Sequence, residues 1–275
     1  MTQNRVLLYG MMMDKSTLIE KTAQEPEDRL LLAKVLDKYD QTQRRNIPAA
    51  TVFLSPREQQ LAQSLLSAAG VRAGYVLDGG YGEAERKRLV FLPDWAGEET
   101  AGEQLAFLRA DFRGPDSALT HRDILGSLMG LGVVRERVGD ILVSPHSADI
   151  VAAPSLLDFF LREWTEAGRV KLSVSRIDRE ELRVPQVQVK TIRDTVSSLR
   201  LDAVVAAAFS MSRGRAAELI AAGRVNLEHV PCLKPDKPVG EGAVLTARGL
   251  GKARLTEVGG LSKKGRTGIT IEKFI

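Results

Sequence analysis

Arginines lie at the joints of a helical stretch in the last third of the chain, "SLRLDAVVAAAFSMSRGRAAELIAAGRVNLE" at residues 198–228. Ser198 and Ser212 can each cap a helix, because apolar residues recur at helical spacing after both serines. The basic residues at the ends of these two helices are Arg200, Arg213, Arg215 and Arg224. A guanidinium beside the free backbone amides at a helix start can bind a phosphate together with those amides. The stretch therefore predicts contacts with a polyanion.

The charge of the chain is divided unevenly along its length. Residues 186–275 hold 15 Lys+Arg against 8 Asp+Glu, whereas residues 1–185 hold 24 against 27, and the whole chain of 275 residues has a net charge of +4. A basic C-terminal third is expected of a nucleic-acid-binding protein, and an ordinary basic surface is the alternative. Further basic candidates for RNA contacts lie in predicted strands of this third: Arg248, Lys252 and Arg254.

The remaining composition argues against several other kinds of site. A single cysteine, Cys232, excludes a disulfide framework and a thiolate metal site, and the three histidines are widely separated. No apolar run is long enough for a membrane span, and the N-terminus lacks a signal-peptide cleavage pattern. The methionine run at 11–13 is interpreted as core or as an alternative start of translation. We expect a cytoplasmic bacterial protein without a metal or cofactor.

Three short motifs resemble enzyme motifs but lack a required feature. "GMMMDKST" is one residue too short for a phosphate-binding loop, and Asp14 stands where that loop has a glycine. "HRDILGSL" at 121–128 lacks the metal-binding asparagine of a kinase catalytic loop. "RLD" at 200–202 matches the motif that carries the catalytic aspartate of pseudouridine synthases. Asp202, however, falls in the first turn of a predicted helix, where it complements the helix dipole.

The elements upstream of this stretch predict two further regions. Residues 1–70 are expected to be mostly helical, with the clearest helix starting at Ser55 as cap and Pro56 as first residue. Residues 71–180 are expected to run strand, helix, strand pair, helix, strand. This is the order of a split-βαβ sheet, which RNA-recognition modules also use. No strand rich in aromatic residues is present, so a base-stacking sheet is not predicted.

A second contact surface for RNA or the ribosome is a further hypothesis for the central region. Its candidate residues flank a predicted helix with an apolar interior, and they are His121, Arg122, Arg135 and Arg137. Beyond this region, the polar stretch 179–186 with Pro185 is predicted to be a linker. Residues 188–255 are expected to pack two short helices on a small twisted sheet, and residues 256–275 to form a basic strand or tail. The fold class is therefore α+β.

Residues 199–251 resemble the RNA-binding domain named after the fourth protein of the small ribosomal subunit, called the S-four domain below. The residues that carry the resemblance are Arg200-Leu201-Asp202, Ser212-Arg213, Ile220, Gly223 and Val225-Asn226. Two positions depart from the family pattern, since Leu227-Glu228 replaces a short turn and Ala243 replaces an aspartate. Both positions lie in predicted hairpins, so they affect the expected loop geometry more than the expected RNA binding.

Segments further upstream resemble the YlmH-type family of bacterial S-four proteins over roughly residues 13–273. They are "FLSPREQQLAQSLL", "DGGYGEAERKRLVFLP" and "LTHRDILGSLMGLGVVRERVGDILV". The resemblance implies a helical N-terminal part, a central RNA-recognition-like domain and a C-terminal S-four domain. It also implies a ribosome-associated protein that contacts large-subunit ribosomal RNA and tRNA in rescue or quality control of stalled translation. A role in cell division has been suggested for the family, and no enzymatic activity comes with it.

We therefore expect a non-catalytic RNA-binding protein. Its partners would be ribosomal RNA, tRNA and the large ribosomal subunit, without a membrane or a small-molecule substrate. The candidate RNA-binding residues are Arg200, Ser212, Arg213, Arg215, Arg224, Arg248, Lys252 and Arg254. Two alternatives stay open: an RNA-modifying enzyme of the pseudouridine synthase or methyltransferase type, and a cell-division adaptor tethered to RNA.

Overall fold

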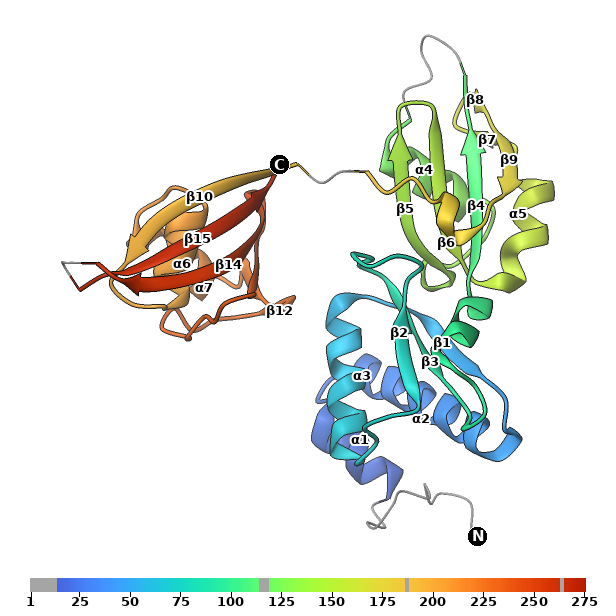
Figure 1. Cartoon of the computed structure of the whole chain (residues 1–275), viewed down its shortest axis with the longest axis horizontal. Helices are drawn as coiled ribbons and strands as arrows, with labels where there is room; N and C mark the ends of the chain where they lie inside the picture. The colour runs from blue at the N-terminus through green and yellow to red at the C-terminus, as the bar shows by residue number, and fades with distance from the viewer. Residues whose placement is uncertain (1–13, 114–118, 186–187, 263–264) are drawn as a thin grey trace. The chain divides into compact units, whose positions relative to one another are not determined.

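The chain forms two compact units, Met1–Pro185 and Gln186–Ile275, called the first and second unit below (Figure 1). The computed structural model describes residues 14–113, 119–185, 188–262 and 265–275. The methionine run at 11–13 therefore lies outside the described residues. Within the described ranges, no helix is both long and apolar enough to span a membrane.

The N-terminal part of the first unit packs three helices against an antiparallel sheet with the strand order β1-β3-β2. Its elements are α1 (Lys15–Thr22), α2 (Pro26–Arg45), β1 (Ala49–Leu54), α3 (Pro56–Ala68), β2 (Tyr75–Asp78), β3 (Lys87–Phe91) and the 3-10 helix η1 (Glu98–Gln104). The start of α3 confirms the predicted cap. The Ser55 hydroxyl accepts from the backbone N–H of Glu58, and the Glu58 carboxylate accepts from the backbone N–H of Ser55.

The predicted boundary at residue 70 is wrong, because the strands β2 and β3 belong to the N-terminal sheet. Each residue of β2 is paired with β3, and β3 is paired with β1. The backbone hydrogen bonds of these strands are therefore satisfied within the N-terminal part. The change from one sheet to the next falls between Phe91 and Ala106 instead.

The second part of the first unit has four antiparallel strands in the order β5-β6-β4-β9. Its elements are β4 (Ala106–Asp111), α4 (His121–Gly130), η2 (Arg135–Arg137), β5 (Val138–Ser144), β6 (Ser147–Ala152), η3 (Pro154–Leu156), α5 (Leu157–Glu163), β7 (Glu166–Ala167), β8 (Val170–Lys171), β9 (Ser173–Arg176) and η4 (Arg179–Glu181). The first and third of the four strands lie in the centre, as in a split-βαβ unit. Helices α4 and α5 contribute Leu128 and Phe160 to the core against one face of this sheet.

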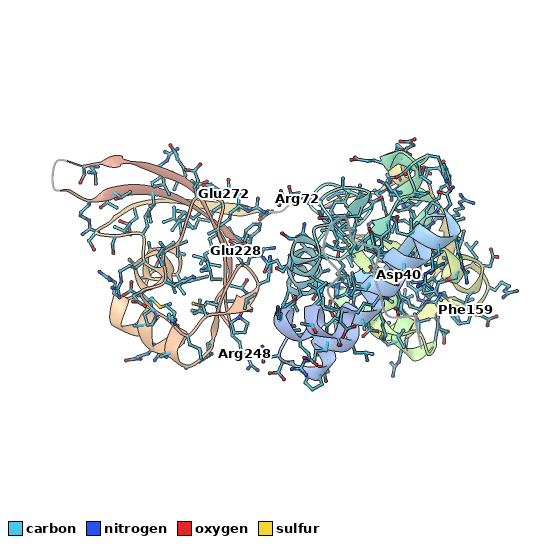
Figure 2. The ribbon with its side chains drawn as sticks, turned by 90° about the horizontal axis from the view of Figure 1, so that it is seen from below. Asp40, Arg72, Phe159, Glu228, Arg248 and Glu272 are labelled. Carbon is cyan, nitrogen blue, oxygen red and sulfur yellow. The ribbon has the colours of Figure 1, made fainter. Side chains whose placement is uncertain are left out.

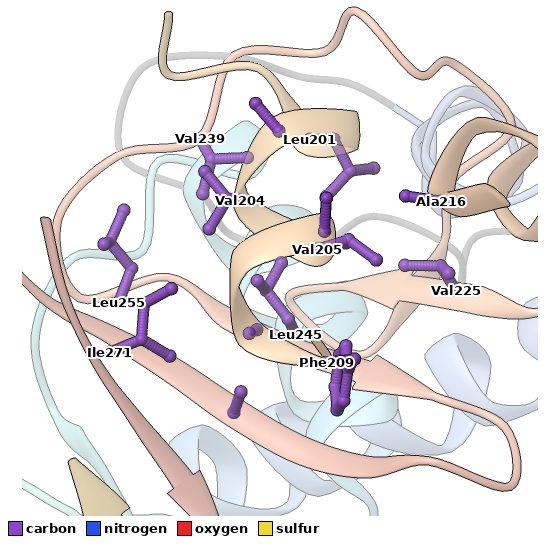
Figure 3. Close-up of a cluster of buried hydrophobic side chains, with 14 of the residues drawn as sticks. Leu201, Val204, Val205, Phe209, Ala216, Val225, Val239, Leu245, Leu255 and Ile271 are labelled. Atoms are coloured by element: carbon purple, nitrogen blue, oxygen red, sulfur yellow. The ribbon is translucent and has the colours of Figure 1, made fainter. Parts of the chain in front are cut away.

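The second unit packs two helices on a six-stranded sheet with the order β10-β15-β14-β13-β11-β12. Its elements are β10 (Val189–Val196), α6 (Leu201–Ala208), α7 (Arg213–Ala221), β11 (Val225–Leu227), β12 (Val230–Pro231), β13 (Val244–Ala247), β14 (Gly251–Leu261) and β15 (Thr267–Phe274). Figure 3 shows the core between helices and sheet, where Leu201 and Val205 of α6 lie among Leu245, Leu255 and Ile271. All five side chains are fully buried.

Of the predicted strand or tail at residues 256–275, the structure shows the strand, because β15 and the second half of β14 belong to this sheet. Strand β15 pairs with β10 along its whole length, from Val189 opposite Phe274 to Val196 opposite Thr267. It also pairs with β14 on its other side. Strand β15 therefore lies within the sheet, between β14 and β10, the strand that begins the second unit.

Candidate nucleic-acid interface

The second helix of the second unit begins at the cap that the sequence predicts. The Ser212 hydroxyl accepts a hydrogen bond of 3.2 Å from the backbone N–H of Arg215. Ser210, in the turn before it, has a φ of 53°, a left-handed conformation that lets only four residues separate α6 from α7. The cap orients the first turn of α7, so Arg213 lies directly at the positive end of the helix.

The first helix begins differently, and the prediction that Ser198 caps it is wrong. The cap position of α6 is Arg200, whose side chain makes no capping hydrogen bond. The backbone N–H groups of Leu201 and Asp202 donate instead to the carbonyls of Lys237 and Pro235, at 2.9 Å each. These two amides of α6 are therefore already satisfied by a distant loop and cannot also bind a phosphate.

The carboxylate of Asp202 connects the starts of the two helices. Arg213 Nη2 donates to both of its oxygens, at 2.9 Å to Oδ2 and 3.1 Å to Oδ1. Arg200 donates to the same two oxygens at 3.4 Å each. Arg213 Nη1 also reaches the Ser197 hydroxyl at 3.3 Å. Asp202 thus holds two guanidinium groups beside the first turn of α7.

The two arginines of this cluster stay accessible while the aspartate does not. The side chains of Arg200 and Arg213 are 43% and 47% exposed, whereas that of Asp202 is 9% exposed. Burial alone raises the pKa of Asp202, but the hydrogen bonds and charges of Arg213 and Arg200 outweigh it, so the pKa lies below its ordinary value. Asp202 is therefore ionised at neutral pH, and the cluster carries one net positive charge.

The remaining arginines of the helical stretch lie apart from this cluster. Arg215 donates to Glu218 at 2.7 Å in an exposed pair one turn along α7. Arg224 follows the other end of α7, and its backbone N–H donates to the carbonyl of Leu219 at 2.9 Å. It donates to the carbonyl of Arg248 at 3.3 Å, and both arginines are exposed (Arg248 is labelled in Figure 2). The arginines at the ends of the helices therefore form two basic positions, Arg200 with Arg213 at the start of α7 and Arg224 at its other end.

Comparison with known proteins assigns this chain to a family. The family model described as "YlmH, N-terminal" matches residues 27–94, and the one described as "Putative RNA-binding domain in YlmH" matches residues 106–181. The "Ribosome-associated protein quality control protein P2" of Bacillus subtilis (strain 168) is 35% identical over 223 residues, which are 81% of this chain and 86% of that protein. The chain belongs to the YlmH family. A solved structure, the cell division protein ylmH from Streptococcus pneumoniae, is 24% identical, with a TM-score of 0.48, covering 59% of this chain and 98% of that chain.

The two YlmH segments correspond to the two sheets of the first unit. Residues 27–94 contain all of β1, β2 and β3, and residues 106–181 contain β4, β5, β6 and β9. The family boundaries therefore agree with the strand pairing rather than with the boundary at residue 70 that the sequence predicts.

Two candidate residues of the second unit lie on a different surface from Arg213. Lys252 and Arg254 alternate along β14 with Ala253 and Leu255, which are buried under the helices. Since neighbouring residues of a strand point to opposite faces, Lys252 and Arg254 lie on the sheet face away from α6 and α7. Lys252 Nζ lies 5.2 Å from the centre of the Phe274 ring.

The proposed second surface of this YlmH-family chain is divided by α4. His121 and Arg122 are exposed in its first turn, whereas Arg135 and Arg137 follow its other end, about 15 Å away along the axis. Arg135 Nη1 donates to the carbonyls of Val138 and Gly139, the latter at 2.9 Å, and burial lowers the pKa of Arg135 to about 10. The structure thus separates the four residues into two pairs and uses Arg135 to hold the start of β5.

The sheet face on which RNA-recognition modules stack bases is closed in this chain. On the face away from α4 and α5, the central strands carry Arg109 and Asp149, which are only 9% and 1% exposed. Arg109 Nε and Nη2 donate to the two oxygens of Asp149 at 2.7 and 2.8 Å. Arg109 and Asp149 thus form a buried ion pair on this face, and Phe107, the aromatic residue of β4 on the same face, is only 8% exposed and lies under Arg179.

The cover over this face comes from the stretch predicted as a linker. Arg109 Nη2 donates to the carbonyl of Glu181 at 2.6 Å, and the backbone N–H of Arg183 donates to Asp149 at 2.7 Å. Arg183 Nη1 also reaches the Ser147 hydroxyl at 3.1 Å. The linker prediction is therefore wrong for residues 179–183, because polar groups of the sheet face need these partners. Sequence reasoning missed Arg109 and Asp149, which have no recognisable spacing.

Proposed function

We propose that this chain is a non-catalytic RNA-binding protein of the cytoplasm that associates with the ribosome. Its second unit would act as an S-four domain that contacts large-subunit ribosomal RNA and tRNA, in rescue or quality control of stalled translation. The name of the Bacillus subtilis relative, a ribosome-associated quality control protein, supports the ribosomal role. The observation that carries the RNA contact is the Asp202 cluster, where two half-exposed guanidiniums lie beside the capped start of α7.

The cluster suits phosphate recognition for three reasons. A guanidinium offers two parallel donors to two phosphate oxygens, and its charge persists at all physiological pH values. Asp202 fixes both side chains, so less conformational entropy is lost when a phosphate binds. The helix dipole of α7 adds positive potential at the same place. The basic balance of residues 186–275 would attract RNA over a longer range.

The affinity should depend on salt, and substitution of Arg213 should reduce that dependence. Each neutralised phosphate contributes about −0.7 to −0.9 to the slope of log affinity against log salt concentration. If Arg200, Arg213, Arg215, Arg224 and Arg248 each neutralised one phosphate, the slope would be roughly −3.5 to −4.5. Because Asp202 and Glu218 each offset one charge, we expect a slope of about −2 to −3. Arg213→Ala should weaken binding roughly tenfold, the value of one charge-assisted hydrogen bond, and reduce the slope by about one. Fluorescence anisotropy with a labelled structured RNA measures both.

Two further variants make this test specific. Arg213→Lys should weaken binding less than Arg213→Ala, because it keeps the charge and loses only the two-donor geometry. Arg193→Ala removes an equal charge from an exposed position of β10, and it should change the affinity less than twofold. Unchanged affinity and unchanged salt slope in Arg213→Ala would contradict the proposal.

The RNA-modifying alternative receives no support from the geometry of Asp202. Both of its oxygens accept hydrogen bonds from arginines, and its side chain is 9% exposed, so it offers no free lone pair to a base. We expect ribosomal RNA and tRNA to remain chemically unchanged after incubation with the purified protein. Mass spectrometry of digested nucleosides checks this expectation. A new modified nucleoside that disappears with Asp202→Asn would establish catalysis instead.

A further inference from the structure

The first unit contains a hollow of about 430 Å³ where its two sheets approach each other. Its walls come from α2, β1, β3 and η1 of the N-terminal part, and from η2 and the segment after β6 of the second part. Three basic side chains line it, Lys38, Arg88 and Arg137, together with the two acidic residues Glu103 and Glu136. The lining therefore carries one net positive charge.

Arg88 forms a fixed wall of this hollow. Its Nε donates to the carbonyl of Thr51 at 2.6 Å, its Nη1 donates to the carbonyl of Gln104, and its Cζ lies 5.8 Å from the centre of the Phe53 ring. Burial, followed by the positive charge of Arg137, lowers the pKa of Arg88 to about 10. Arg88 is half-buried and lies near the charge of Arg137, so an anion that bound nearby would stabilise its charged form.

Arg137 and Lys38 are held by fewer hydrogen bonds than Arg88. Arg137 Nη2 donates to the hydroxyl of Ser155, and Lys38 Nζ donates to Gln41 Oε1 at 3.2 Å. Among the described residues, neither of them nor Arg88 forms an ion pair with a carboxylate. Three cations therefore line one hollow without a direct negative partner, although two carboxylates share the lining.

We propose that this hollow binds a phosphate of an RNA backbone. One phosphodiester carries a single negative charge and would neutralise the net charge of the lining, and a guanidinium binds its oxygens through paired N–H donors. The hollow is within the size range of small-ligand sites. Since the sheet face of residues 106–181 is closed by residues 179–183, RNA contact by this part requires another surface. The hollow is lined by η2 and by the segment that follows β6, which belong to that part.

The inference rests on RNA as the partner proposed above, but it concerns only residues of the first unit. The full-length protein is tested with Arg137→Glu against a fluorescein-labelled RNA hairpin with single-stranded ends. We expect at least a tenfold loss of affinity and a salt slope that is reduced by about one. The matched control is Arg162→Glu at an exposed position of α5, which should change the affinity less than twofold. Lys38→Glu is a second variant of the hollow, in case Arg137→Glu lowers the melting temperature.

The outcomes separate this inference from the proposed function. If the wild type binds the hairpin and both Arg137→Glu and Lys38→Glu bind it equally well, the hollow is not an RNA contact. If the wild type itself does not bind RNA, the proposed function fails together with this inference. A second arm adds inorganic phosphate or adenosine monophosphate and follows the melting temperature. Stabilisation of the wild type but not of Arg137→Glu, with unchanged RNA affinity, would show a small-anion site and overturn the assignment to RNA.

Discussion

Asp149→Ala is expected to lower the free energy of unfolding of the first unit by about 3–5 kcal/mol. The substitution leaves the guanidinium of Arg109 buried without its counter-charge, since the Asp149 side chain is only 1% exposed and accepts from Arg109 at 2.7 and 2.8 Å. The backbone N–H of Arg183 loses its acceptor at the same time. The free energy of unfolding is measured by chemical denaturation of the full-length protein, monitored through a spectroscopic signal that reports on the first unit.

Two controls separate the buried charge from other effects of the substitution. Asp158→Ala removes a carboxylate at the start of α5 outside the buried core and should change stability by no more than about 0.5 kcal/mol. Replacing the whole pair, with Arg109→Met and Asp149→Leu together, should cost much less than Asp149→Ala alone, because no unpaired charge remains. A loss below about 1 kcal/mol for Asp149→Ala would show that the pair contributes little.

The same substitution should loosen residues 179–183, which bind to the sheet through this ion pair. Hydrogen exchange at the backbone N–H of Arg183 should become faster, because its acceptor is the Asp149 carboxylate. The ion pair thus links the stability of the central sheet to the segment that leads into the second unit.

Local signals in the sequence predicted the helix starts well. Ser55 and Ser212 each bind a backbone amide within the next three residues, and the pattern for such caps is contained in four consecutive letters. The helix periodicity of α3 and α7 is equally local. These elements could be predicted because the groups that stabilise them are neighbours in the chain.

Partners that are far apart in the sequence could not be predicted in this way. Ser198 is not a cap because carbonyls more than thirty positions downstream reach the start of α6 first. Strand β10 was missed because most of its residues are exposed and its hydrogen-bond partner, β15, is at the other end of the unit. The pairing of Arg109 with Asp149, forty positions apart, likewise leaves no pattern in the letters.

In the candidate site, too, features set by neighbouring residues could be predicted and features set by distant partners could not. The residue types and the position of Arg213 at a helix start followed from the sequence, but the role of Asp202 as a shared partner of two arginines did not. The structure also separates the basic candidates, since α7 lies between Arg213 and Arg224, and the strand alternation places Lys252 and Arg254 on the sheet face away from the helices. Charge alone does not show which cations a phosphate chain can reach together.

Leu201→Ala is expected to destabilise the second unit by roughly 2–5 kcal/mol, although it lies between two residues of the proposed RNA site. Its side chain is fully buried and contacts the core that joins α6 to the sheet (Figure 3), so its removal leaves a cavity. The matched control is Leu261→Ala, which removes the same atoms from a side chain that is 75% exposed and should change stability by about 0.5 kcal/mol or less.

Leu201→Ala also distinguishes loss of folding from loss of RNA contact. Below its melting transition the variant should keep the affinity and the salt slope of the wild type, because Arg200, Asp202 and Arg213 still form their hydrogen bonds. Arg213→Ala should show the reverse pattern, with weaker binding, a smaller salt slope and a second unit that remains folded. A smaller salt slope in folded Leu201→Ala would mean that the core sets the arginine geometry, and the two effects would then not be separable at this site.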